Sequence, residues 1–252
     1  GDDAAARYAA DADRAIAELD AAGYGVGAVM IDASFVNHGI IDVPAGYLKL
    51  VVDKVRAAGG VFIADEVQSG FGRIGSHMWG CQAHGAEAEI VALGKPIGNG
   101  LALGAIVTTP EILASFTEKT GYFSTFGGNP VACAAGSAVL DVIEDEQLLA
   151  NAVGTGEYLR QGLRALAQRH PMIGDVRGAG MIAGVELVRD RGTQEPAKQE
   201  TKRVINAMKE KGVLVGREGY LGNVLKIRPP MVFTPENADF LIAALDDAVS
   251  AI

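Results

Sequence analysis

The sequence predicts an α/β fold: a mostly parallel sheet with crossover helices, followed by a smaller C-terminal α+β domain. Two observations point to this class. Short apolar runs rich in Val, Ile and Ala alternate with amphipathic segments over the first 150 residues, as buried parallel strands alternate with their covering helices. The 252 residues and their 49% hydrophobic content are also sufficient to bury a large core.

The N-terminal part is predicted to contain a helix, a strand, a second helix and then three strands. Residues 9–20 place apolar side chains at helical spacing ahead of a glycine cluster, and "GAVMID" follows as a short strand. Residues 44–60 begin with a proline and end with two glycines, which marks both ends of a helix. Further strands are expected at "VFIAD", "EIVALG" and "GAIVTT", and a long helix is expected from Asn129-Pro130 through Ile143.

The pattern changes after residue 168. The stretch "IGDVRGAGMIAGVELV" predicts a glycine-punctuated pair of strands, and residues 197–211 predict a charged amphipathic helix. "NVLKIRPPMVF" is expected to form a strand that ends in a double proline, and residues 235–252 a final helix. We therefore predict two domains, at residues 1–150 and 151–252.

Charge and cysteine content narrow the classes of partner and compartment. The net charge is −9 and no basic stripe is present, so nucleic acid is not an expected partner. Cys81 and Cys133 are too few for a disulfide framework, which favours a reducing compartment and hence the cytoplasm. No apolar run approaches the roughly 20 residues of a membrane helix, and the N-terminus is acidic where a secretion signal would be basic, so neither membrane insertion nor export is expected.

Two residues at predicted strand ends carry chemistry. Asp65 closes "VFIAD", and ligands of α/β sheets gather at the carboxyl ends of strands, although a lone aspartate there most often caps a turn. Lys95 ends another apolar strand, where a surface lysine is the ordinary interpretation. Pro96 favours an extended Lys95, and the glycine-rich loop that follows would leave the amine desolvated and nucleophilic toward a carbonyl.

An acid and a nucleophilic lysine fit pyridoxal 5'-phosphate. This cofactor needs a lysine to hold its aldehyde as a Schiff base and a carboxylate to keep its pyridine nitrogen protonated. A metal is the weaker alternative, because His77, Cys81 and His84 lack a fourth ligand and lie in a segment that is predicted to pack as a helix around Trp79. No metal site is therefore expected.

Three motifs in order make the prediction specific: "FIADEVQSGFGRIG", "ALGKPIGNGLALGAIVTT" and "YFSTFGGNPVACAAG". They resemble the class III (omega) aminotransferases, which are fold type I pyridoxal phosphate enzymes. "GGVFIADEVQ", "GKPIGNG", "IGDVRG" and "NVLKIRPPM" are similar to the alanine-glyoxylate aminotransferase 2-like branch, which includes the ethanolamine-phosphate phospho-lyases. The resemblance covers nearly the whole chain and implies the C-terminal part of such an enzyme: residues 1–150 would complete the cofactor-binding large domain, and the N-terminal cofactor-binding elements are not found.

The resemblance also implies roles for individual residues. Asp65 would pair with the pyridine nitrogen, Val67 would lie against the ring, and Gln68 would reach the ring hydroxyl oxygen. Lys95 would form the Schiff base and then carry the proton between substrate and cofactor. Thr125 would hold the cofactor phosphate of the neighbouring subunit, so a homodimer with a shared active site is expected.

Substrate choice depends on the strand before the double proline. Many members of the family have an arginine that binds the substrate α-carboxylate at the position of Lys226 in this chain, and Arg228 lies two residues on. Either the exchange is harmless, or α-carboxylates are held weakly, since lysine cannot form a bidentate fork. The resemblance also implies that Glu66 supports Asp65 without contacting the cofactor itself. We expect amino transfer from a primary amine or amino acid to a keto acid. The alternatives are a phospho-lyase acting on an amino-alcohol phosphate such as ethanolamine phosphate, and an incompetent fragment that serves as a dimerising scaffold.

Overall fold

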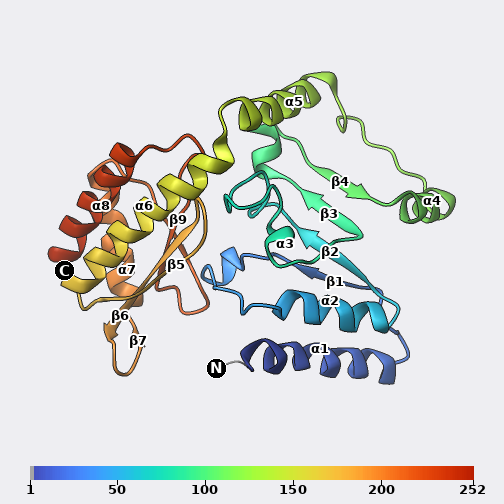
Figure 1. Ribbon diagram of the computed structural model, residues 1–252, viewed down its shortest axis with the longest axis horizontal. Coiled ribbons are helices and arrows are strands. Elements are labelled where there is room, and N and C mark those ends of the chain that lie inside the picture. The colour runs from blue at the N-terminus through green and yellow to red at the C-terminus, as the bar shows by residue number, and fades with distance from the viewer. Residues whose placement is uncertain (1–2) are drawn as a thin grey trace. The chain divides into compact units, whose positions relative to one another are not determined.

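The computed structural model describes residues 3–252 and divides the chain into two compact units, each shown in Figure 1. The second unit contains residues 147–252 together with two short segments, 34–42 and 72–76, which we call the first and second straps. All other residues through 146 belong to the first unit. The domain boundary at about residue 150 stays a prediction. A single boundary would assign both straps to the first unit, whereas they pack with the second.

The first unit contains a four-stranded sheet in the order β1 (Ala28–Ile31), β2 (Val61–Asp65), β3 (Ile90–Leu93) and β4 (Ala105–Thr108). The first three strands are parallel, and β4 is antiparallel to β3. This confirms the predicted mostly parallel α/β class. The register places Asp65 opposite Ala92, so the chain leaves β2 and β3 at the same edge of the sheet.

Among the described residues, the α-helices of the first unit are α1 (Ala4–Ala21), α2 (Tyr47–Ala57), α3 (Gly80–Ala83), α4 (Pro110–Lys119) and α5 (Pro130–Asp145). The α2 helix buries Leu48 and Val52 beside Phe62 of β2, which forms the centre of the core of this unit. The α5 helix begins as predicted, because Asn129 caps it by accepting from Ala132 N–H at 3.0 Å. The α4 helix was not predicted; it buries no residue, and its apolar side chains Leu113 and Phe116 are exposed.

The second unit is an antiparallel sheet covered by helices. Its strand order is β5 (Ile173–Arg177), β6 (Ala183–Asp190), β9 (Val224–Ile227) and β8 (Gly216–Glu218), with β7 (Glu195–Pro196) paired to β6. The helices are α6 (Leu148–Arg169), α7 (Lys198–Glu210) and α8 (Pro235–Ser250). Side chains such as Leu163, Val185 and Leu245 form one core between sheet and helices. The strand expected over "NVLKIRPPMVF" ends at Ile227, before the double proline removes two backbone donors.

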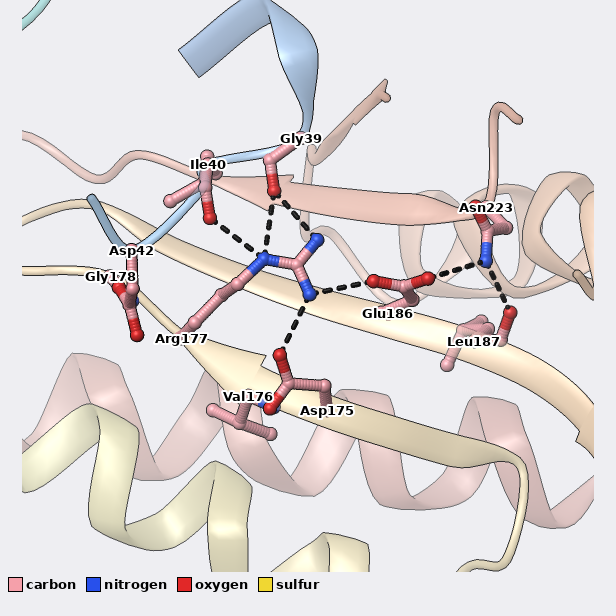
Figure 2. Close-up of polar contacts among 10 residues, drawn as sticks. All are labelled: Gly39, Ile40, Asp42, Asp175, Val176, Arg177, Gly178, Glu186, Leu187 and Asn223. Atoms are coloured by element: carbon pink, nitrogen blue, oxygen red, sulfur yellow. Dashed lines mark hydrogen bonds and ion pairs between the residues drawn. The ribbon is translucent and has the colours of Figure 1, made fainter. Parts of the chain in front are cut away.

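Arg177 fixes the first strap to this sheet (Figure 2). Its Nε donates to Ile40 O at 2.8 Å, and its Nη2 donates to Gly39 O at 2.9 Å. Its Nη1 pairs with Asp175 at 2.8 Å and with Glu186 at 2.6 Å. Burial alone would lower the pKa of Arg177, but these two carboxylates raise it above its ordinary value. The guanidinium therefore stays charged while it satisfies two backbone carbonyls of the strap.

The second strap is fixed by close backbone packing. Met181 N–H donates to Arg73 O at 2.8 Å, and Ile74 is buried. A Cβ on Gly180 would stand 2.3 Å from Arg73 O, and a Cβ on Gly156 of α6 would stand 2.0 Å from Gly180 O. Glycine is required at both positions because a larger residue would collide with backbone that cannot rotate away.

Candidate active site

Asp65 is the last residue of β2 and begins the turn that follows it. Its Oδ1 accepts from Val67 N–H at 3.1 Å. This is the turn-capping role that a lone aspartate often has, and it also sets the direction of the carboxylate. Gln68, three residues on, is 7% exposed. The turn is thus well ordered by its own hydrogen bonds and burial.

Lys95 follows β3 and starts a short 3-10 helix, Lys95–Gly98. The expectation of an extended, desolvated lysine is wrong on both points: its φ is 43°, in the left-handed region, and its side chain is exposed. Pro96 disfavours the right-handed conformation for Lys95, and the chain turns at once into the 3-10 helix with Lys95 in the left-handed region instead of extended. Across residues 3–252, no carboxylate pairs with the Lys95 ammonium. Strained non-glycine residues of this kind are frequent at functional sites.

The structure brings the Asp65 turn and the Lys95 loop together. Lys95 lies three residues beyond Ala92, the partner of Asp65 in the parallel ladder. The two Val67 methyl carbons are 3.6 Å from the point where a Cβ on Gly94 would stand. Val67 is therefore in van der Waals reach of the backbone immediately before Lys95, as a residue lying against a ring held by that lysine would need to be.

Thr125 lies in the loop before α5 and is exposed. Ser124 Oγ accepts from Gly127 N–H at 2.9 Å, and Asn129 Nδ2 donates to Phe126 O at 2.9 Å, so the loop has its own hydrogen bonds. Within the described part of the chain, no hydrogen bond joins Thr125 to the Asp65 turn. The predicted role of Thr125, which is to hold the cofactor phosphate of the neighbouring subunit, stays a prediction.

The two predicted substrate residues, Lys226 and Arg228, lie in the second unit. Lys226 of β9 forms an ion pair with Glu218 of β8, and the two side chains are 19% and 22% exposed. Arg228 is exposed just beyond the strand. The pKa of the Arg73 guanidinium is lowered to about 10. Burial is the larger cause, and the nearby positive charge of Arg228 is the smaller one. Sequence reasoning did not identify Glu218; its spacing from Lys226 becomes informative only once the two strands are known to pair.

Two residues of the metal alternative, Cys81 and His84, lie near the buried Glu66. Burial and the nearby Glu66 carboxylate raise the pKa of the Cys81 thiol to about 12. Burial lowers the pKa of His84. In residues 3–252 there is no group of three or more His, Cys, Asp and Glu side chains placed to hold a metal ion.

Cys81 and Cys133 should differ sharply toward thiol reagents. Cys81 is buried and protonated, while Cys133 is exposed. At pH 8 we expect iodoacetamide to alkylate Cys133 and to leave Cys81 unmodified until denaturant is added, as peptide mass spectrometry would show. Equal labelling of both residues in the native protein would contradict the burial of Cys81.

Comparison with known proteins decides the family. A sequence profile described as Aminotransferase class-III matches residues 3–249. The chain belongs to the class III aminotransferases. It is 52% identical over 212 residues to alanine–glyoxylate aminotransferase 2 homolog 2, mitochondrial, of Arabidopsis thaliana, covering 84% of this chain and 44% of the relative. The chain spans about half the length of the curated relatives it matches.

Solved structures show the same fold. A phospholyase from Arthrobacter in complex with phosphoethanolamine matches with a TM-score of 0.95 and 46% identity, over 98% of this chain and 59% of that one. An amine transaminase from an uncultivated Pseudomonas species, in its PLP-bound form, matches with a TM-score of 0.89 and 31% identity, over 98% and 56%. The prediction of fold type I is confirmed.

The cytoplasmic prediction is wrong, because similar aminotransferases of Arabidopsis thaliana and Homo sapiens are mitochondrial by name. Two cysteines indicate only that no disulfide framework is needed; they do not distinguish one reducing compartment from another. Among the helices of residues 3–252, none has the length and apolar character needed to cross a bilayer.

Pyridoxal phosphate is the cofactor of the family. The residues of this chain fit it: Lys95 presents an exposed amine, and Asp65 supplies an oriented carboxylate at the same sheet edge. Val67 donates to Asp65 and lies within van der Waals reach of Gly94, next to Lys95. When bound, the cofactor supplies an acceptor for the electrons of a substrate carbanion.

Proposed function

We propose that the whole protein is a pyridoxal phosphate-dependent aminotransferase that moves an amino group from a primary amine or amino acid to a keto acid. The proposal depends on one observation above all: Asp65 and Lys95 leave adjacent parallel strands at one edge, in a chain that belongs to the class III aminotransferases. The exposed Lys95 amine is available to a carbonyl, and the carboxylate of Asp65 has the charge that a protonated pyridine nitrogen needs.

The remaining site residues are proposed in supporting roles. Val67 lies against the ring, Gln68 contacts the ring hydroxyl oxygen, and Lys95 returns the proton to substrate or cofactor. Thr125 serves the cofactor phosphate of a neighbouring subunit in a homodimer. The exposed aromatic side chains that flank it, Tyr122, Phe123 and Phe126, support an interface there, because they are 76%, 86% and 83% exposed.

A phospho-lyase acting on an amino-alcohol phosphate is the second candidate. It is favoured by the likeness to the Arthrobacter phospholyase and by the Lys226–Glu218 ion pair. Because Glu218 already balances the charge of Lys226, we expect Lys226 to bind a substrate α-carboxylate more weakly than an arginine at this position would. Arg228, exposed and two residues on, is the other proposed substrate cation.

One experiment separates these functions. The full-length protein, loaded with cofactor, is given ethanolamine phosphate alone and, separately, alanine with glyoxylate. We expect amino transfer to glyoxylate without release of phosphate. Release of phosphate and ammonia in the absence of a keto acid would establish the lyase instead. A protein that stays colourless with added cofactor and shows neither activity would support the scaffold alternative.

A further inference from the structure

Glu66, the neighbour of Asp65, is a fully buried carboxylate with 0% exposure. Among residues 3–252, no cationic side chain is paired with it. Its Oε2 instead accepts from Ser69 Oγ at 2.8 Å and from Gly80 N–H at 2.7 Å, and its Oε1 accepts from Cys81 N–H at 2.8 Å. Hydrogen bonds to an ionised acceptor are the strong ones, and a buried charge without them would be very costly.

The backbone around Glu66 is shaped to permit this arrangement. Its N–H donates to Ala92 O at 3.0 Å, and its carbonyl accepts from Gly70 N–H at 3.1 Å. A Cβ on Gly70 would stand 2.6 Å from Glu66 O, and one on Gly80 would stand 2.6 Å from Ser69 Cβ. Glu66 thus connects the end of β2 to β3 and to the start of α3, through contacts that leave no room for larger residues.

We propose that Glu66 is a positioning residue that fixes the turn 65–68 for the cofactor. The inference rests on the proposed function. The direction of the Asp65 carboxylate depends on the hydrogen bond that it accepts from Val67 N–H. Val67 must also lie beside Gly94 if it is to contact a ring held by Lys95. Glu66 lies between Asp65 and Val67 in the chain, and its side-chain hydrogen bonds fix the backbone that connects them. It touches no reacting atom; it acts through Asp65 and Val67.

The test is Glu66→Gln in the full-length protein, with Val52→Ala as the matched control. An amide has one acceptor oxygen, whereas N–H donors point at both oxygens of Glu66, so the NH₂ group of the variant side chain would face a donor whichever way it turned. Val52→Ala removes core volume from the same unit without changing the turn. The readouts are the Kd for pyridoxal phosphate and the visible circular dichroism of the bound cofactor, each compared with the thermal midpoint.

We expect Glu66→Gln to weaken the Kd about tenfold or more and to reduce the visible dichroic band, while Val52→Ala stays within about threefold of wild type. If Glu66→Gln does not fold, Ser69→Ala removes one donor to Glu66 and should weaken the Kd about fivefold or more, beyond the range of the control. Equal affinities in variant and wild type, or an equal loss in the control, would overturn the role of Glu66 alone. A wild-type protein that binds no cofactor would instead overturn the proposed function.

Discussion

Replacing Lys95 by alanine is expected to lower the rate of amino transfer by roughly 10³-fold or more and to remove the absorbance band of the lysine-bound cofactor. The side chain is exposed, so its loss leaves no cavity. Alanine at a φ of 43° is strained about as much as lysine, so the thermal midpoint should not change. The loss would therefore be chemical and not structural.

The matched control for this prediction is Lys49→Ala. Lys49 is an exposed lysine of α2 in the same unit, and it pairs only with the exposed Asp53 four residues on. This variant should keep both the absorbance band and the rate. Amino transfer by Lys95→Ala at a rate within about tenfold of wild type would remove Lys95 from the site.

Replacing Gly156 by alanine should destabilise the protein by about 3 kcal/mol or more. The new Cβ would stand 2.0 Å from Gly180 O and 2.6 Å from Gly180 C, and both atoms are backbone. No rotamer change can relieve such a contact, so α6 must move away from residues 178–181. Urea denaturation followed by circular dichroism measures the loss.

Gly154→Ala is the control from the same helix. A Cβ at Gly154 would meet nothing within 4 Å, so alanine should stabilise α6 by about 0.5–1 kcal/mol through its higher helix propensity. The two substitutions differ only in position. Unfolding midpoints that moved in the same direction would show that the close approach of Gly156 to Gly180 is absent in solution.

The sequence was sufficient for features that depend on local pattern. Asp65 ends its strand as predicted, because an apolar run gives way to a glycine-rich loop there. Asn129 and Pro130 start α5 as predicted, because capping is a property of adjacent residues. The cofactor could be predicted for the same reason, because each family motif is a contiguous stretch of sequence.

What the sequence did not reveal depends on residues far apart in the chain. The partner of Lys226 comes from another strand, and the attachment of the first strap depends on Arg177, 138 positions from Gly39. The α6 helix was not predicted, and it begins directly after Gln147, which has a left-handed backbone conformation. The conformation of Lys95 was mispredicted because the extended backbone favoured before a proline is only a preference, and here the immediate turn into Lys95–Gly98 overrides it.

The straps have a consequence for how this protein can be divided. The chain enters the second unit at Ser34, returns at Val43, enters again at Gly72, returns at His77, and enters a last time at Gln147. A gene cut once after Glu146 would therefore leave the second unit incomplete. The first product would hold the whole first unit and also carry straps whose buried side chains have lost their cover, and the second would keep Arg177 without the carbonyls it holds. Exchange of small units between class III enzymes by a single crossover should fail for this reason, whereas exchanges that move the straps as well should succeed.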